Sequence, residues 1–415
     1  MTRITAFPGS FMKTLWRLPL VVVLALAFFA GTDATARDSA AWRAAWGTSQ
    51  QGLDAAAVVS DTTVRMIVRP TLPASHVRVQ LQNTFGTVPL DVAAASIAAR
   101  ANGALLVAGT LKPLTFGGSP SVSIPAGGAV YSDPVAFEAH AWQDLAVSLY
   151  LPGTGVPVSR HSNARKTSFV APNGSGNRAA DEAATAFTTP ITSMWWVANL
   201  DVLTSQADGT IVFFGDSITD GTGTTTDGHD RWHDIVVLRM LLDSKGKTQF
   251  GAVNQGIGGN RVTNIFPGGS PAAVDRLDRD VLARSGATHV VLFEGTNDIQ
   301  AGVTADQLIA GIQNVIDRVH AARLPIIGAT IIPRHNATWT AQMTQYRNIV
   351  NDWIRHKANF DGVIDFDRLI RSAADPDLMN PILDLGDHIH PNPFGYFLMG
   401  QEVELKLFEK HVPVK

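Results

Sequence analysis

Short alternating runs of apolar and polar residues fill the chain from about residue 40 to residue 206. Val77, Val79 and Leu81 alternate with polar neighbours, and similar runs recur between turn signals of Gly and Pro. A period of two with frequent turns is typical of antiparallel strands with one buried face. We therefore predict a β-rich, β-sandwich-like accessory domain over residues 37–206. The Ala-rich stretch 92–101 fits a strand or a helix equally well.

After Gly209 the pattern changes to apolar runs that alternate with helical periods. Thr304 and Gln307 form a capping box, and apolar residues on one helical face follow it. Ser270 and Pro271 predict the start of a second helix, with Pro at its first position. Five apolar runs are candidate buried strands: 211–214, 250–253, 289–293, 326–331 and 363–366. Residues 207–415 are therefore predicted to form an α/β domain with a doubly wound, flavodoxin-like parallel sheet of five strands.

The first 36 residues have the layout of a secretory signal peptide. Arg3, Lys13 and Arg17 precede an apolar run over residues 18–30, and small residues occupy 34–36. The apolar run of about 13 residues is shorter than the roughly 20 that a membrane-spanning helix needs. We expect cleavage after Ala36, no stable membrane anchor after cleavage, and a secreted protein that is periplasmic or extracellular.

The composition argues against several classes of function for this chain. The formal net charge of −3 and the pI near 6.4 give no reason to expect a nucleic-acid partner. The chain has no cysteine, which excludes disulfides, a cysteine nucleophile and a thiolate metal site. Stability must therefore rest on core packing.

Polar residues follow the predicted strands of the second half. Because ligands bind outside the carboxyl ends of such strands, we expect these residues to converge in space. The polar segments are 215–220, 254–260, 294–298 and 387–392.

The residue types in these segments fit acyl transfer. Ser217 needs a base to become a nucleophile, and His390 is the candidate base. Asp387, three residues earlier, can hold the imidazole in the required tautomer. The backbone N–H groups of Ser217 and Gly259 and the side-chain amide of Asn297 are candidate donors to an oxyanion. No metal or other cofactor is predicted.

With these residues in place, the chain resembles the GDSL or SGNH hydrolase superfamily, over about residue 210 to the C-terminus. The four blocks of that superfamily have counterparts in the same order: Gly215-Asp216-Ser217, Gly259, Gly295-Thr296-Asn297-Asp298, and Asp387 with His390. The second block departs from the family, because Gly258-Gly259-Asn260 stands where many members have Ser-Gly-Asp. The early tryptophans Trp42 and Trp46 and the β-rich half look like the accessory region of secreted members related to xylan esterases.

The resemblance implies a serine esterase with a Ser-His-Asp triad that cleaves short acyl groups, most simply acetyl, from oxygen esters. Acetylated polysaccharide is the expected substrate. The alternatives are a broad short-chain lipase or arylesterase and, from another class, an inactive polysaccharide-binding protein. The oligomeric state stays open.

Several neighbouring residues have simpler interpretations. His388 is a rival to His390 for the base, and Asp216 is interpreted as a brace of the turn. The segment 220–230 is interpreted as a solvated loop and not as a calcium site. Glu294 is either a buried hydrogen-bonded group or a modulator of neighbouring pKa values. Trp42, Trp46, Trp195 and Trp196 are assigned to packing in preference to a sugar platform.

Overall fold

The computed structural model describes residues 40–243 and 249–409, which belong to one compact unit. The predicted signal peptide lies outside the described residues. The boundary predicted between residues 206 and 207 stays a prediction.

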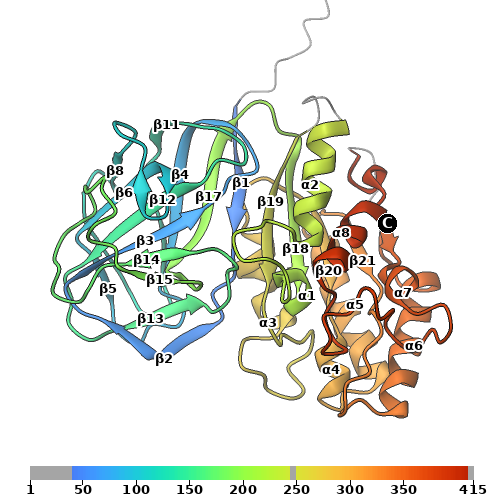
Figure 1. Cartoon of the computed structure of the whole chain (residues 1–415). Coiled ribbons are helices and arrows are strands. Elements are labelled where there is room, and N and C mark those ends of the chain that lie inside the picture. The colour runs from blue at the N-terminus through green and yellow to red at the C-terminus, as the bar shows by residue number, and fades with distance from the viewer. Residues whose placement is uncertain (1–39, 244–248, 410–415) are drawn as a thin grey trace, which may run out of the picture. The chain divides into compact units, whose positions relative to one another are not determined.

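The N-terminal half is built from short strands (Figure 1). They are β1 (Ala41–Gly47), β2 (Gly52–Val59), β3 (Thr62–Val68), β4 (Ala74–Gln82), β5 (Leu90–Val92), β6 (Ala94–Asn102), β7 (Leu105–Leu106), β8 (Lys112–Leu114), β9 (Val122–Ile124), β10 (Ala129–Tyr131), β11 (Val135–Ala139), β12 (Leu145–Leu151), β13 (Val156–His161), β14 (Ser168–Val170), β15 (Thr189–Ile191), β16 (Met194–Trp195) and β17 (Val197–Thr204). The ambiguous stretch 92–101 is therefore mostly strand.

Two antiparallel sheets share the main core of this half. One has the order β1-β17-β4-β10, and the other has the order β15-β14-β3-β12-β6-β7. Val79 of β4, Met66 of β3 and Val147 of β12 belong to the same buried cluster. The predicted β-rich region is confirmed, whereas its finer description as β-sandwich-like stays a prediction.

The strand β3 is more buried than its alternation suggests. All seven residues of β3 are buried, although one face was expected to be polar. Arg65 explains the difference, because it is covered by Phe187, whose ring centre lies 3.8 Å from its guanidinium carbon. The guanidinium also donates to Ser148 and to the carbonyl of Ala104.

The C-terminal half contains one parallel sheet of order β19-β18-β20-β21-β22. Its strands are β18 (Gly209–Gly215), β19 (Phe250–Gly256), β20 (Ala287–Phe293), β21 (Ile326–Ala329) and β22 (Gly362–Ile364). Its helices are α1 (Ser217–Asp220), α2 (Trp232–Asp243), α3 (Ala273–Leu277), η1 (Asp278–Leu282), α4 (Thr296–Gln300), α5 (Ala305–Ala321), α6 (Ala341–His356), α7 (Phe366–Ile370), α8 (Pro393–Glu402) and η2 (Leu405–Phe408). All five predicted strands are present.

Helices cover both faces of this sheet, as Figure 1 shows. Val212 and Phe214 of β18 pack with α3, α5 and α6 in one core cluster. Ile211 and Phe213 point the opposite way and pack with α2, α7 and α8 in another. Successive residues of β18 thus pack into hydrophobic cores on opposite faces of the sheet, which confirms that the sheet is doubly wound.

The two helix starts predicted from sequence have different outcomes. The capping box of Thr304 and Gln307 is confirmed at the start of α5. The start predicted at Pro271 is wrong, because α3 begins at Ala273. The side-chain amide of Asn260 donates to the hydroxyl of Ser270 and to the carbonyl of Pro271. Ser270 and Pro271 therefore bind Asn260 and precede the helix.

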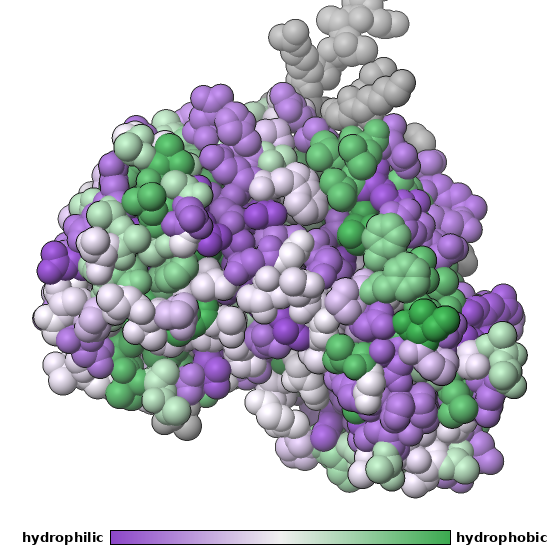
Figure 2. Space-filling model, viewed as in Figure 1, coloured by the Kyte–Doolittle hydropathy of each residue, from purple (hydrophilic) through white to green (hydrophobic). Residues whose placement is uncertain are grey.

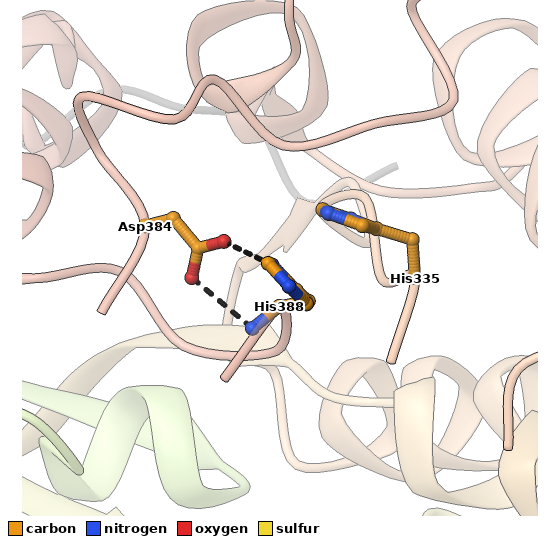
Figure 3. Close-up of side chains that lie close together, drawn as sticks. All are labelled: His335, Asp384 and His388. Atoms are coloured by element: carbon orange, nitrogen blue, oxygen red, sulfur yellow. Dashed lines mark hydrogen bonds and ion pairs between the residues drawn. The ribbon is translucent and has the colours of Figure 1, made fainter. Parts of the chain in front are cut away.

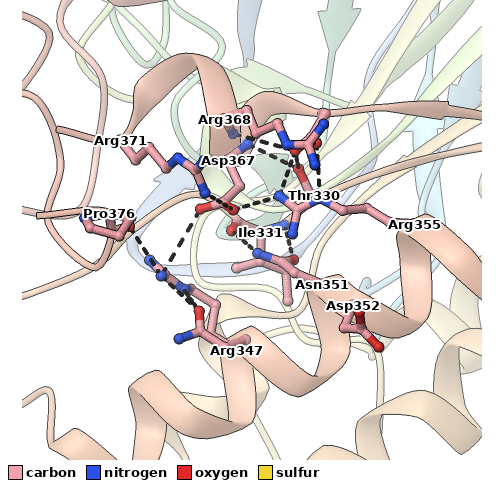
Figure 4. A network of polar contacts seen from close by, with 12 residues as sticks. Thr330, Ile331, Arg347, Asn351, Asp352, Arg355, Asp367, Arg368, Arg371 and Pro376 are labelled. Carbon is pink, nitrogen blue, oxygen red and sulfur yellow. Dashed lines mark hydrogen bonds and ion pairs between the residues drawn. The ribbon is translucent and has the colours of Figure 1, made fainter. Parts of the chain in front are cut away.

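A polar network fixes the segment that comes after β21 (Figure 4). The side chain of Asn351 on α6 accepts from the N–H of Ile331 and donates to its carbonyl, both at 2.8 Å. Arg355, one turn later, pairs with Asp367 of α7 at 2.6 Å. The chain leaving β21 toward Arg334 is therefore held in place from α6.

Polar and apolar side chains both reach the surface of the described residues. Figure 2 shows hydrophobic side chains over α2 and α8, where Leu242 and Phe394 are more than half exposed. No helix of the described segments is long and apolar enough to cross a membrane.

Candidate active site

Ser217 lies at the junction of β18 and the short helix α1. Asp216 is the N-cap of α1, and its carboxylate accepts the N–H of Ile218 at 2.9 Å. A side chain at Gly215 would place a Cβ 2.4 Å from the carbonyl oxygen of Phe293, so only glycine fits there. The tight strand-to-helix turn thus arises directly from the sequence around Ser217.

His390 and Asp387 come from the loop before α8 and meet Ser217 in space. The hydroxyl oxygen of Ser217 lies 2.9 Å from Nε2 of His390. On the other side of the same ring, Nδ1 lies 2.6 Å from the carboxylate of Asp387. Residues 173 positions apart in the sequence are therefore joined in one hydrogen-bonded chain.

The carboxylate of Asp387 is itself fixed. Its second oxygen accepts the backbone N–H groups of Ile389 and His390, both at 2.9 Å. Burial acts to raise the pKa of Asp387, but the hydrogen bonds from His390 and from the two backbone amides outweigh it and lower the pKa. The carboxylate is thus ionised near neutral pH. His388 takes no part in this chain, because its ring is bonded to Asp384.

Gly259 and Asn297 lie on two segments that Asp298 joins. Asp298 accepts the N–H groups of Val262 and Thr263 at 2.8 and 2.9 Å, and it also accepts the Thr263 hydroxyl. Gly259 has a φ of +72° and is exposed, with open space where a side chain would lie. The side-chain amide of Asn297 donates to the carbonyl of Asn260 at 2.9 Å. Arg334 donates to the oxygen of the same amide at 3.4 Å.

A fully buried arginine lies beneath the strand ends. Arg276 of α3 donates to the carbonyls of Gly215 and Gln255 at 3.0 and 2.7 Å, and to the side chain of Asn260 at 2.9 Å. It also pairs with Asp280 and lies over the ring of Phe214. The ends of β18 and β19 are therefore connected through one guanidinium.

Glu294, at the end of β20, is a buried carboxyl. Burial raises the pKa of Glu294 well above its usual value. The positive charge of Arg276, 3.9 Å away, lowers the pKa but does not outweigh the burial. Within the described residues neither carboxyl oxygen has a hydrogen-bond partner. Of the two roles left open for Glu294, the hydrogen-bonded one is not observed.

The β-rich half contacts the segment after Ser217. Nε2 of His161, the last residue of β13, lies 3.0 Å from the carboxylate of Asp220, and both side chains are buried. The interpretation of 220–230 as a solvated loop is therefore wrong for Asp220, while Asp227 is exposed as expected. Trp195 and Trp196 are buried, as the packing interpretation predicted.

A groove adjoins the Gly259 segment and has walls from both halves of the chain. Its volume is about 390 Å³. Gln51 and Phe85 contribute from the β-rich half, and Gly259, Thr263 and Phe266 contribute from the other side.

Sequence reasoning missed several residues around the site. Asp298 lies beside Asn297 in the polar segment after β20, and its role could have been inferred from that position. Arg276 and Asp280 are four residues apart, a spacing that indicates only a helical ion pair. Nothing in the sequence near His161 or Arg334 indicates that His161 contacts Asp220 or that Arg334 contacts Asn297.

Part of the chain is similar to a known protein family. The GDSL-like lipase/acylhydrolase family matches residues 213–398, which include Ser217, Gly259, Asn297, Asp387 and His390. This segment is therefore similar to the GDSL-like lipase/acylhydrolase family. The match covers a little under half of the chain. A comparison with curated proteins gave no match.

Solved structures similar to the GDSL-like segment are also esterases or lipolytic proteins by their descriptions. A putative lipolytic protein of the G-D-S-L family from Desulfitobacterium hafniense is 20% identical, with 48% of this chain and 100% of that chain covered and a TM-score of 0.38. A variant of an acetyl xylan esterase from Geobacillus stearothermophilus is 20% identical over 47% and 93%, with a TM-score of 0.36. A psychrotrophic esterase from Pseudoalteromonas sp. is 21% identical over 47% and 94%, with a TM-score of 0.36. At these TM-scores the likenesses carry no weight in assigning a function.

Proposed function

We propose that the protein is a secreted serine esterase in which Ser217, His390 and Asp387 form the catalytic triad. The observation that carries the proposal is the continuous hydrogen-bonded chain from the Ser217 hydroxyl through both ring nitrogens of His390 to Asp387. In this chain His390 is the base and Asp387 fixes its tautomer and orientation. The GDSL-like family match supports ester hydrolysis as the reaction class.

The proposed reaction has two halves. The Ser217 oxygen attacks the ester carbonyl carbon while Nε2 of His390 takes the hydroxyl proton, and the same proton then passes to the leaving alcohol oxygen. Water repeats the sequence on the acyl-enzyme, which releases the acid and restores the serine. Asp387 stays ionised throughout and stabilises the imidazolium.

The negative charge on the carbonyl oxygen needs fixed donors. We propose the N–H groups of Ser217 and Gly259 and the side-chain amide of Asn297. A carboxamide nitrogen carries two hydrogens, so the bond from Asn297 to the Asn260 carbonyl leaves one for the substrate. The positive φ of Gly259 and the open space beside it let a substrate approach this N–H.

Acetylated carbohydrate is the proposed substrate class. The groove beside Gly259 supports this, because Gln51 supplies an amide and Phe85 and Phe266 supply aromatic faces next to the proposed oxyanion donors. The alternative is a broad short-chain lipase or arylesterase. It is favoured by the exposed apolar side chains of Ile382 and Leu385, which shortly precede Asp387 in the sequence. Acetate release from acetylated xylan, compared with turnover of p-nitrophenyl esters of increasing chain length, separates the two.

The central test is the variant Ser217→Ala. We expect its kcat on p-nitrophenyl acetate to fall by about 10⁴–10⁶-fold, because triad members act as a unit. Its circular dichroism and melting temperature should match those of the wild type, since one hydroxyl is removed without other change. An active-serine fluorophosphonate should label the wild type and leave the variant unlabelled. Substantial turnover by the folded variant would disprove the mechanism.

A further inference from the structure

Three potential metal ligands lie together beside the proposed triad. His335 is on the segment after β21, whereas Asp384 and His388 are on the loop before α8 (Figure 3). One ligand atom from each side chain lies within 4.8 Å of the other two. Two ligands of one Zn²⁺ ion lie roughly 3–4 Å apart, given bonds of about 2.0–2.2 Å, so the side chains, including the two stacked imidazoles, rotate to direct their ligand atoms at one ion.

The three side chains are held in this arrangement by other contacts. One carboxylate oxygen of Asp384 lies 2.6 Å from Nδ1 of His388. The other oxygen accepts the backbone N–H groups of Gly386 and His388. The backbone N–H of His335 donates to the carbonyl of His388 at 3.1 Å. The two imidazole rings are stacked, with centres 4.3 Å apart. The cluster is thus built from both segments and does not depend on one flexible side chain.

The backbone of His388 adds an independent observation. Its φ is +62°, in the left-handed region that side chains other than glycine rarely adopt. Such a conformation is unfavourable and persists only where surrounding contacts impose it. Here it directs an imidazole against Asp384 and onto the His335 ring (Figure 3).

We propose that His335, Asp384 and His388 form a binding site for a divalent transition-metal ion of the Zn²⁺ class. Two imidazole nitrogens and one carboxylate oxygen suit such an ion, whereas Mg²⁺ and Ca²⁺ prefer oxygen ligands alone. The side chain of His388 is about half exposed, which leaves a route for the ion and a position for a water ligand.

The role of the ion is structural. It ties the segment that carries Arg334 to the loop that carries Asp387 and His390, which are one and two residues from His388. It therefore stabilises the loop without taking part in ester cleavage. This inference does not rest on the proposed esterase function.

The test uses untagged full-length mature protein that has been stripped with a chelator and dialysed. Titration with ZnCl₂ in a calorimeter should show one ion bound per chain. The melting temperature should rise by about 3–5 °C at a hundredfold excess over Kd, because the ion binds the folded state. MgCl₂ at the same concentrations should produce neither effect.

Variants locate the site. His335→Ala and His388→Asn should each weaken Zn²⁺ binding at least tenfold and remove the rise in melting temperature. Asn tolerates the left-handed conformation, so His388→Asn preserves the loop. The matched control is His356→Ala, because His356 forms a similar pair with Asp352 four residues earlier but belongs to no three-residue cluster among the described residues.

His390→Ala should retain stoichiometric binding, which separates this site from the triad. The proposal is overturned if no Zn²⁺ binds. It is also overturned if folded His335→Ala and His388→Asn bind as the wild type does, or if His356→Ala or His390→Ala removes the binding instead.

Discussion

At the scale of single residues, two buried aspartates near Ser217 accept different numbers of hydrogen bonds. Asp216 accepts one backbone N–H, from Ile218, whereas Asp298 accepts two backbone N–H groups and a hydroxyl. Burial raises the pKa of both, and it raises that of Asp216 to about 7. Their substitution by asparagine should therefore have different consequences.

Asp216→Asn should change how stability depends on pH. In the unfolded chain an aspartate has a pKa of about 3.9, so between about pH 4 and 7 the folded state holds a proton that the unfolded state has lost. The contribution of Asp216 therefore declines as the pH rises through that window and is lost above about pH 7. Asparagine still caps α1 but has no such titration. We expect the variant to gain stability relative to the wild type from pH 4 to pH 8, measured by urea unfolding at each pH.

Asp298→Asn is the contrasting control, because an amide oxygen cannot replace a carboxylate that accepts three hydrogen bonds. It should lose stability at every pH and lower kcat, since the Gly259 segment loses its anchor. Asp387→Asn should lower kcat by up to about 10⁴-fold through the wrong tautomer of His390, while Asp216→Asn should cost less than tenfold. A large kcat loss in Asp216→Asn would mean that the triad acid has been misassigned.

The sequence alone could predict that Ser217, His390 and Asp387 lie close together, because each lies at the end of a recognisable strand or just before α8. It could not predict the residues that hold the neighbouring segments in place. Arg276 and His161 act through contacts between segments that are distant in sequence, and such contacts leave no local pattern of spacing or periodicity. The buried state of Asp220 was missed for the same reason, since its partner is in the β-rich half.

At the scale of elements, the strands and the parallel type of the second sheet could be predicted from the apolar pattern, whereas burial and exact helix starts could not. The alternation in β3 predicted one exposed face, but a segment from elsewhere covers it. Pro271 fits the first turn of a helix, yet Asn260 binds its carbonyl and the helix begins at Ala273. Local propensity was overridden by tertiary hydrogen bonds in both places.

Arg276 connects elements that carry the proposed site, and its removal should affect both stability and catalysis. Arg276→Met leaves the carbonyls of Gly215 and Gln255 and the carboxylate of Asp280 without their partner in a buried position. Breaking a buried ion pair in this way typically costs about 3–5 kcal/mol. We expect a lower free energy of unfolding and, well below the melting temperature, a fall in kcat of at least tenfold, measured by urea unfolding and p-nitrophenyl acetate turnover.

The matched control is Arg347→Met. Arg347 is equally buried but lies on α6, in the network of Figure 4. It pairs with Asp377 at 2.9 Å. It should lose comparable stability while kcat stays within about twofold of the wild type. If Arg276→Met cannot be obtained folded, Arg276→Lys provides a milder test. An equal effect of both methionine variants on kcat would show that Arg276 acts only through global stability.

At the scale of the whole described unit, the β-rich half supports the GDSL-like half and also borders its groove. Ser49 bonds to Gln255 at the end of β19, and His161 bonds to Asp220 after Ser217. Removing residues 37–206 would therefore expose Gln255 and Asp220 as well as remove a groove wall. Single substitutions in that wall give a clearer test of substrate binding than a deletion.

Phe85 and Gln51 allow that test, because they line the groove from the β-rich half and lie away from the Ser217–His390–Asp387 chain. A polymeric substrate has sugar units beyond the acyl group that can contact them, whereas p-nitrophenyl acetate has none. We expect Phe85→Ala and Gln51→Ala to lower kcat/KM on acetylated xylan by about 2–10-fold, the factor that corresponds to about 0.5–1.5 kcal/mol of lost aromatic contact for Phe85 or of a lost hydrogen bond for Gln51. On p-nitrophenyl acetate both variants should match the wild type. Leu105→Ala, an exposed apolar residue of β7 outside the groove, should change neither rate. Equal rates on xylan for the wild type and both groove variants would restrict the β-rich half to structural support.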